Sequence, residues 1–313
     1  MTERPPSTGH EPTNPPAHPD ELAPEALELQ PGVRLVLGDG LDFLASLPRH
    51  SVHAVVTDPP YALVEYEAKD HAKLRKGRGG VWRIPPTLDG VTRSPVPRFT
   101  VLTEADKQRL DALFARLGEV VAHALVPGGH LLCAATPLLS SRIFVQLEQA
   151  GLHKRGEIIR LVQTLRGGDR PKGAHQAFRD VTVMPRAGWE PWGLFRSALD
   201  GTVANTLRTW GTGGLRRVSD EQPFRDVIPS GPTPRRERQL SSHPSLKPQA
   251  FLRQVVRASL PLGVGVVVDP FAGSASTLAA AASLGYHAIG VERDVDYVRG
   301  AVESFEALRD LSP

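Results

Sequence analysis

The stretch AVVTDPPYAL (residues 54–63) joins a short apolar segment to a carboxylate, two prolines and an aromatic ring. Residues 54–56 predict a buried strand, and the prolines must end it because neither can donate to a β-ladder and each fixes its own φ. Asp58 and Tyr61 therefore follow the end of a strand. In an open α/β sheet this is the carboxyl edge, where ligands bind. A rigid turn with a helix-capping Asp fits the same residues, so the rest of the chain has to decide.

Strands and helices are expected to alternate on both sides of this stretch. A strand over 34–39, a helix over 41–47 and a strand over 53–58 imply a parallel βαβ unit. Thr103 and Asp106 fit the capping box of a long helix, and PGG at 127–129 is expected to stop it. Further strands are expected at 130–136, 156–163, 189–196, 265–269 and 286–292, and further helices at 138–151, 247–260, 276–285 and 294–308.

Composition excludes several classes of protein. No run approaches the roughly 20 apolar residues of a membrane span, and the N-terminus lacks an apolar signal core, so a soluble cytoplasmic protein is expected. The single cysteine, Cys133, excludes a disulfide framework and suits a packed core thiol. The 11 histidines include no pair with metal-ligand spacing, so no metal is expected.

Positive charge is concentrated in two segments. Residues 1–28 carry six acids and one base, so residues 29–313 carry +8, against a net charge of +3 for the whole chain. The segment 62–100 has eight bases and four acids, and 155–240 has 15 bases and nine acids. Such segments favour a polyanionic partner, although a solvated charged surface is the alternative.

A second motif, VVVDPFAGSAST (266–277), predicts a strand, a tight turn and a helix start. Such a turn brings backbone N–H groups close to a cofactor, and Glu292 follows at the end of the next strand, where an acid can hold both ribose hydroxyls. The turn lacks the glycine spacing of dinucleotide folds and the lysine of a phosphate loop. A nucleotide-like cofactor other than NAD or ATP is indicated.

Four motifs together resemble the S-adenosylmethionine-dependent amino-methyltransferases of DNA. They are DPPY (58–61), HPSLKP (243–248), DPFAGSAST (269–277) and GVE (290–292). The catalytic motif precedes the cofactor motif, which resembles the circularly permuted β group. The resemblance implies an α/β fold: a doubly wound, mostly parallel sheet with a reversed edge strand, here 189–196, and a recognition insertion. Ala275 departs from the usual glycine of the turn, at little cost if its φ is negative.

The resemblance also implies where the cofactor binds. Adenosine would lie over the turn, its ribose on Glu292 and its adenine amine on Asp39. The methionine carboxylate would bind hydroxyl and ammonium groups near the turn. The complete set of cofactor candidates is Asp39, Ser245, Lys247, Asp269, Phe271, Gly273, Ser274, Ser276, Thr277 and Glu292.

The catalytic candidates are Asp58, Pro59, Pro60 and Tyr61. The Asp58 side chain and the Pro59 carbonyl would accept both N–H bonds of an exocyclic amine, and Pro60 would hold the turn rigid. Tyr61 would stack on a base flipped out of double-stranded DNA. Within the family, Asp before Pro-Pro-Tyr favours adenine N6 over cytosine N4.

The expected organisation is a disordered tail (1–28), a catalytic half (29–154) with a basic loop (62–100), a DNA target-recognition region (155–242) and a cofactor-binding half (243–313). Two rival functions remain: an RNA adenine methyltransferase, disfavoured by motif order, and a non-catalytic DNA-binding module, disfavoured by the intact DPPY. A homodimer and a companion restriction endonuclease, as in restriction-modification systems, are left open.

Overall fold

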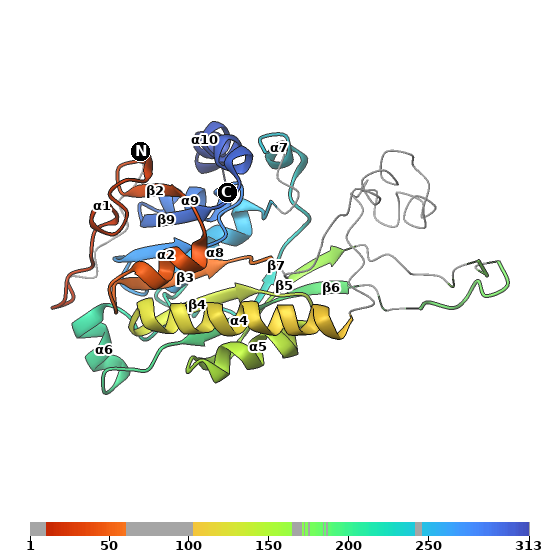
Figure 1. The fold of residues 1–313 in the computed structure, drawn as a ribbon, viewed down its shortest axis with the longest axis horizontal. Coiled ribbons are helices and arrows are strands. Elements are labelled where there is room, and N and C mark those ends of the chain that lie inside the picture. The colour runs from red at the N-terminus through yellow and green to blue at the C-terminus, as the bar shows by residue number, and fades with distance from the viewer. Residues whose placement is uncertain are drawn as a thin grey trace.

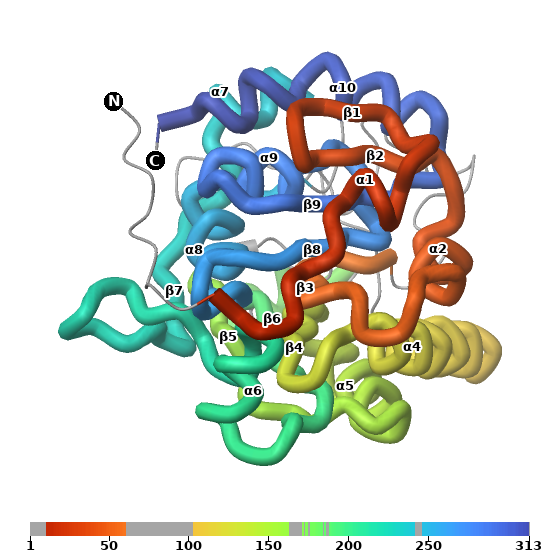
Figure 2. Tube along the Cα trace, turned by 90° about the vertical axis from the view of Figure 1, so that its left-hand side faces the viewer, coloured from red at the N-terminus to blue at the C-terminus, as the bar shows by residue number. Residues whose placement is uncertain are grey.

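The computed structural model describes residues 11–60, 103–164, 171, 173–174, 176–183, 185, 187–241 and 246–312. Within them, nine strands form one sheet in the order β1-β2-β9-β8-β3-β4-β6-β5-β7 (Figures 1 and 2). The strands are β1 (Leu27–Gln30), β2 (Val33–Leu37), β3 (Val52–Thr57), β4 (Leu125–Ala134), β5 (His153–Thr164), β6 (Ala187–Arg196), β7 (Val227–Pro229), β8 (Val266–Asp269) and β9 (His287–Glu292).

Helices cover both faces of this sheet, so the fold is the expected doubly wound α/β type. In Figure 2, α8 and α9 lie on one side and α2 and α4 on the other. The helices are α1 (Pro19–Leu22), α2 (Gly40–Ser46), α4 (Glu104–Ala124), α5 (Ser140–Gln149), α6 (Val203–Trp210), α7 (Arg235–Arg238), α8 (Gln249–Ser259), α9 (Ser276–Ser283) and α10 (Val295–Arg309).

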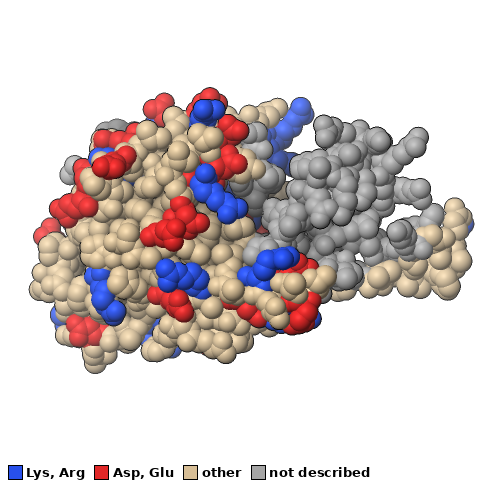
Figure 3. Space-filling view, in the orientation of Figure 1, with Lys and Arg blue, Asp and Glu red and all other residues tan. Residues whose placement is uncertain are grey.

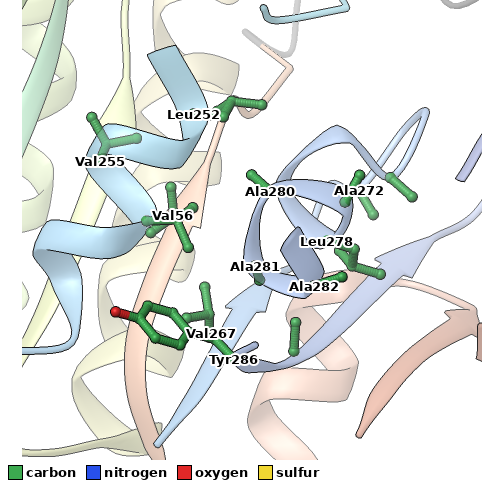
Figure 4. Close-up of a cluster of buried hydrophobic side chains, with 14 of the residues drawn as sticks. Val56, Leu252, Val255, Val267, Ala272, Leu278, Ala280, Ala281, Ala282 and Tyr286 are labelled. Atoms are coloured by element: carbon green, nitrogen blue, oxygen red, sulfur yellow. The ribbon is translucent and has the colours of Figure 1, made fainter. Parts of the chain in front are cut away.

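The central strands are apolar throughout because both of their faces are buried. Along β3, Val56 packs into the core beneath α8 and α9, whereas Val55 points into the core beneath α2 and α4. In β8, Val267 and Val268 divide in the same way. Figure 4 shows the first core, in which small alanines of α9 let the helix lie close to the sheet.

The start of α4 agrees with its capping signal, whereas its end does not agree with the expected stop. Thr103 and Asp106 form the expected capping box at α4. Asp39 caps α2 by accepting from the amides of Leu41 and Asp42. PGG at 127–129 does not stop α4; the helix ends at Ala124 and the three residues lie inside β4. Gly128 there has φ +73, and the strand carries a register shift opposite the start of β3.

The expectation of a disordered tail over residues 1–28 is wrong for residues 11–28. Pro19 starts α1, where a missing N–H costs nothing, and the His18 side chain caps it. Strand β1 then pairs antiparallel with β2, and Leu29 packs against the core. Residues 1–10 lie outside the described residues, as does the basic loop at 62–100.

Strand β6 is antiparallel, as expected for 189–196, but it is not an edge strand. It pairs with β4 on one side and β5 on the other, and β7 lies beyond β5. Pro191 is tolerated there because it lies just past the end of β4 and contributes only its carbonyl, to the Ala135 amide. Part of the region 155–242 therefore belongs to the catalytic sheet, and the expected boundary at residue 154 falls within β5.

Charges of both signs are interspersed on the face shown in Figure 3. Arg142 and Asp111, for example, pair across α5 and α4. No helix in the described part of the chain is long and apolar enough to span a membrane.

Candidate active site

Three carboxylates lie at the carboxyl ends of three adjacent strands. Asp58 follows β3, Asp269 ends β8 and Glu292 ends β9, and these strands are neighbours in the sheet. The Thr57 hydroxyl donates to Asp269 Oδ1 at 2.7 Å. This bond joins the DPP motif directly to the turn of the second motif. Two motifs that are far apart in the sequence therefore form one site.

Asp269 is buried and holds the turn that follows it. Its Oδ1 also accepts from the Phe271 amide at 3.1 Å. Burial raises the pKa of the Asp269 carboxyl to about 6, although hydrogen bonds from Thr277, Thr57 and the Phe271 amide favour its charged form. Asp269 thus holds the turn in place, and its carboxylate already accepts hydrogen bonds from donors of the protein.

Glu292 fixes the other side of the same turn. Its two oxygens accept from the amides of Gly273 and Asp294, each at 2.9 Å. The Ala272 amide donates to the Val291 carbonyl, so the turn lies against the end of β9. The carboxylate is partly exposed and stands beside the loop that begins with Gly38, whose amide donates to the Glu292 carbonyl.

Ala275 has φ +56, so the negative φ at which this alanine would cost little is not present. The left-handed region places a Cβ in a strained position, at a cost of about 1 kcal/mol relative to glycine. The methyl group is fully buried, which offsets part of that cost.

Asp58 carries an ion pair that the motif alone does not reveal. Lys247 Nζ lies 2.5 Å from Asp58 Oδ2 and 3.7 Å from Glu190 Oε2. Burial of the Lys247 ammonium favours the neutral form, but the Asp58 and Glu190 carboxylates outweigh it, and the pKa of Lys247 is raised. Lys247 is therefore a cation held between two carboxylates. Its assignment to the methionine carboxylate stays a prediction.

The other predicted residues fall into four groups. Asp39 is exposed beyond the end of β2, next to Glu292 in the sheet order. Ser274, Ser276 and Thr277 are buried around the start of α9. Tyr61 and Ser245 lie outside the described residues. Pro59 is buried and Pro60 is exposed, directly after Asp58.

Sequence reasoning missed Glu190 and two of its partners, Arg160 and Trp192. The sequence WEPW (189–192) contained a signal for Glu190, because it is an acid between two tryptophans in a mostly apolar strand. Trp192 Nε1 donates to Glu190 Oε1 at 2.8 Å, and Arg160 Nη1 lies 3.4 Å from Glu190 Oε2. Both Trp192 and Arg160 are buried.

The arginines of the region 155–242 do not share one surface. Arg216 donates to the Tyr286 hydroxyl at 2.8 Å, and Tyr286 precedes β9. That is the amino edge of the sheet, opposite Asp58. Arg235 and Arg236 lie on α7, whose Glu237 accepts from the first amide of α8, close to Lys247.

Comparison with known proteins finds a family match over part of the chain. The family model described as DNA methylase, of the N6/N4 type, matches residues 193–303. Residues 193–303 of this chain are thus similar to DNA methylases of the N6/N4 type. The matched residues include the cofactor turn and Glu292 but do not include the DPP motif, which lies earlier in the chain.

Two curated relatives match over short segments. The type II methyltransferase M2.DpnII of Streptococcus pneumoniae is 30% identical over 93 residues, which cover 30% of this chain and 34% of that protein. The DNA adenine methyltransferase YhdJ of Escherichia coli K12 is 41% identical over 58 residues, 18% of this chain and 19% of that protein. The aligned segments thus span about a third or less of these relatives.

Solved structures match over most of the chain. TTHA0409 of Thermus thermophilus, crystallised with S-adenosyl-L-methionine, has a TM-score of 0.51 at 23% identity and covers 88% of this chain and 95% of that one. The PvuII cytosine-N4-specific DNA methyltransferase has a TM-score of 0.58 at 14% identity, covering 97% and 90%. These matches confirm the predicted methyltransferase-type fold.

Proposed function

We propose that the protein transfers the methyl group of S-adenosylmethionine to an exocyclic amino group of a base in DNA. The observation that carries this proposal is the Thr57–Asp269 hydrogen bond, which sets Asp58 beside the turn of the cofactor motif. A methyl donor held at that turn is thereby adjacent to an acceptor for an amine. The similarity of residues 193–303 to DNA methylases supports the same reaction.

The chemistry of the turn and its neighbours fits the cofactor. The partly exposed Glu292 carboxylate offers acceptors to ribose hydroxyls, and the exposed Asp39 carboxylate offers one to the adenine amine. Phe271 is partly buried and supplies an aromatic surface over the turn. S-adenosylmethionine supplies an electrophilic methyl group on a positively charged sulfur when it is bound.

Asp58 and Pro59 would act on the target amine. Its lone pair is conjugated with the base ring, so two oxygen acceptors for the N–H bonds are needed to turn the lone pair toward the methyl carbon. When S-adenosylmethionine is bound, its methyl group would pass to this nitrogen and the remaining thioether would leave, while Asp58 and Pro59 hold the amine and its displaced proton is released to solvent. Pro59 and Pro60 restrict the backbone that carries both acceptors.

Adenine N6 is the proposed target, with cytosine N4 as the alternative. Asp before Pro-Pro-Tyr favours adenine within the family, and the E. coli relative is named an adenine methyltransferase. The cytosine-N4-specific PvuII enzyme shares the fold at only 14% identity, too low to carry a specificity argument. In either case the base must leave the double helix to reach Asp58, which is partly buried at the end of β3.

The partner proposed is therefore double-stranded DNA in the cytoplasm. Three further points stay predictions: the recognition role of residues 155–242, a homodimer, and a companion restriction endonuclease.

The reaction can be tested by incubating the protein with isotopically labelled S-adenosylmethionine and DNA or RNA of mixed sequence. Nucleoside mass spectrometry then identifies the product. We expect labelled N6-methyl-2′-deoxyadenosine from DNA and no label in RNA. Labelled N4-methylcytosine would move the assignment to cytosine, label in RNA would favour the RNA enzyme, and no label in either would overturn the proposal.

A further inference from the structure

Strand β6 delivers a carboxylate to the catalytic motif. Glu190 and Trp192 lie on the same face of β6 because they are two residues apart. That face is covered by α8, since Trp192 packs on Phe251 with ring centroids 5.2 Å apart. Lys247 and Pro248 lead into α8 at the same edge of the sheet. Glu190 is thus placed by the strand, and Lys247 by the helix start.

Both oxygens of Glu190 are engaged. Oε1 accepts from the Trp192 indole, and Oε2 faces both Arg160 and Lys247. Arg160 is its cross-strand partner on β5 and donates further to Ser230 Oγ and the Gly231 carbonyl, at 3.1 and 2.9 Å. These contacts hold the Glu190 carboxylate in one orientation.

Charges alternate from the edge of β5 to the catalytic motif: Arg160, Glu190, Lys247 and Asp58. The side chains of these four residues are 5, 17, 13 and 19% exposed. At this burial each charge needs its neighbours, because an unpaired buried charge is costly. Removing Glu190 leaves Lys247 with Asp58 alone and an unbalanced Arg160 beside it.

We propose that Glu190 is a positioning residue for methyl transfer, acting through Lys247 to fix the orientation of the Asp58 carboxylate. This inference rests on the proposed function. Glu190 does not contact the reacting atoms; it holds the Lys247 ammonium against Asp58 Oδ2. Misorienting one of two preorganised acceptors weakens the transition state more than the ground state.

The first test is Glu190→Gln, which keeps the shape and removes the charge. We expect kcat for DNA methylation to fall about 10-fold, with the dissociation constant of S-adenosylmethionine and KM for DNA changed less than about 2-fold. The alkaline limb of the kcat profile should move to lower pH, because Lys247 loses an anion that favours its charged form. Glu157→Gln on β5, which loses only a half-exposed pair with Lys154, is the matched control and should retain wild-type kinetics.

A double-mutant cycle with Lys247→Met shows whether Glu190 acts through Lys247. Glu190→Gln should have little further effect on kcat in the Lys247→Met background. Additive losses among variants whose urea unfolding curves show them to be folded, or an unshifted alkaline limb, would overturn the inference. A wild-type protein that methylates no nucleic acid would refute the proposed function instead.

Discussion

The Thr57 hydroxyl donates to the Asp269 carboxylate at 2.7 Å, joining β3 to β8 across 212 positions of the chain. Both residues are buried at the ends of strands that lie side by side. This bond brings the end of β3, which Asp58 follows, beside the turn that begins at Asp269. It also predicts that the cofactor turn and the catalytic motif depend on each other for their position.

Replacing Thr57 by Val tests this dependence. The change keeps the shape but removes a donor from a buried carboxylate, so we expect the free energy of unfolding to fall by about 1–3 kcal/mol. Thr57→Ser keeps the donor and serves as the control, losing only a methyl group. Urea unfolding of the three proteins measures the difference, and equal losses in the two variants would show that the hydroxyl is unimportant.

Cofactor affinity is expected to depend on Glu292 more than on Phe271. Glu292→Gln removes the charge and one of the two acceptor oxygens, so either the Gly273 or the Asp294 amide loses its partner, and we expect S-adenosylmethionine to bind about 10–100-fold more weakly. Phe271→Ala should weaken binding by less. Isothermal titration calorimetry gives both constants. Wild-type affinity in both variants would place the cofactor elsewhere.

Much of this site follows from sequence because its parts are local. A strand, a proline-ended turn and an acid specify the position of Asp58, and a strand, a tight turn and a helix start specify residues 266–277. Both lie where the motifs indicate. The Lys247–Asp58–Glu190 contacts need the packing of α8 against β6, which no local pattern encodes.

The edges of the sheet were less predictable than its centre. β6 is apolar with a proline and resembles an edge strand, yet β5 and β7 extend the sheet beyond it. Residues 11–28 have a polar, proline-rich composition, yet they form two elements. Pro19 starts α1, and β1 pairs with β2 and packs Leu29 against the core. In both places tertiary pairing outweighs composition.

Acidic pH is expected to destabilise the protein through two buried histidines. Burial lowers the pKa of His53 to about 4 and that of His130, which also lies near Arg196 and Arg155, to about 3. Unfolding restores values near 6.5, so the unfolded chain binds more protons, and the free energy of unfolding falls as pH drops from about 6.5 toward 4. Asp269 has the opposite pH dependence. Because its pKa is raised to about 6 in the folded protein, it contributes stability that is fully present below about pH 4 and is lost as the pH rises through about 6.

His130→Leu should make the free energy of unfolding less dependent on pH, since it removes one of the two buried neutral imidazole rings. Each histidine contributes a slope of up to about 1.4 kcal/mol per pH unit. Urea unfolding between pH 6.5 and 5 measures it. His153→Gln, at an exposed residue that starts β5, is the control. An unchanged slope in His130→Leu would contradict the assignment.

Substitution of Arg216 should affect DNA binding differently from substitution of Arg235 and Arg236, because these arginines lie at different edges of the sheet. Arg216 lies at the amino edge and bonds Tyr286, so Arg216→Met should lower stability by about 1 kcal/mol and leave DNA affinity unchanged. Changing Arg235 and Arg236 together to Gln should weaken binding and reduce its salt slope by about 1 for each phosphate that is no longer neutralised. Fluorescence anisotropy at several salt concentrations measures both. A reduced salt slope of DNA binding in Arg216→Met would contradict the expectation that Arg216 lies outside the DNA-binding surface.

The central claim is that Asp58 is an acceptor for the amine that is methylated. Its most direct test is the amount of methylated base formed by Asp58→Ala at saturating DNA and S-adenosylmethionine, measured by nucleoside mass spectrometry beside the wild type. We expect turnover to fall by about 10²-fold or more while the affinity for S-adenosylmethionine is retained. Near wild-type turnover by a folded Asp58→Ala protein would contradict the account.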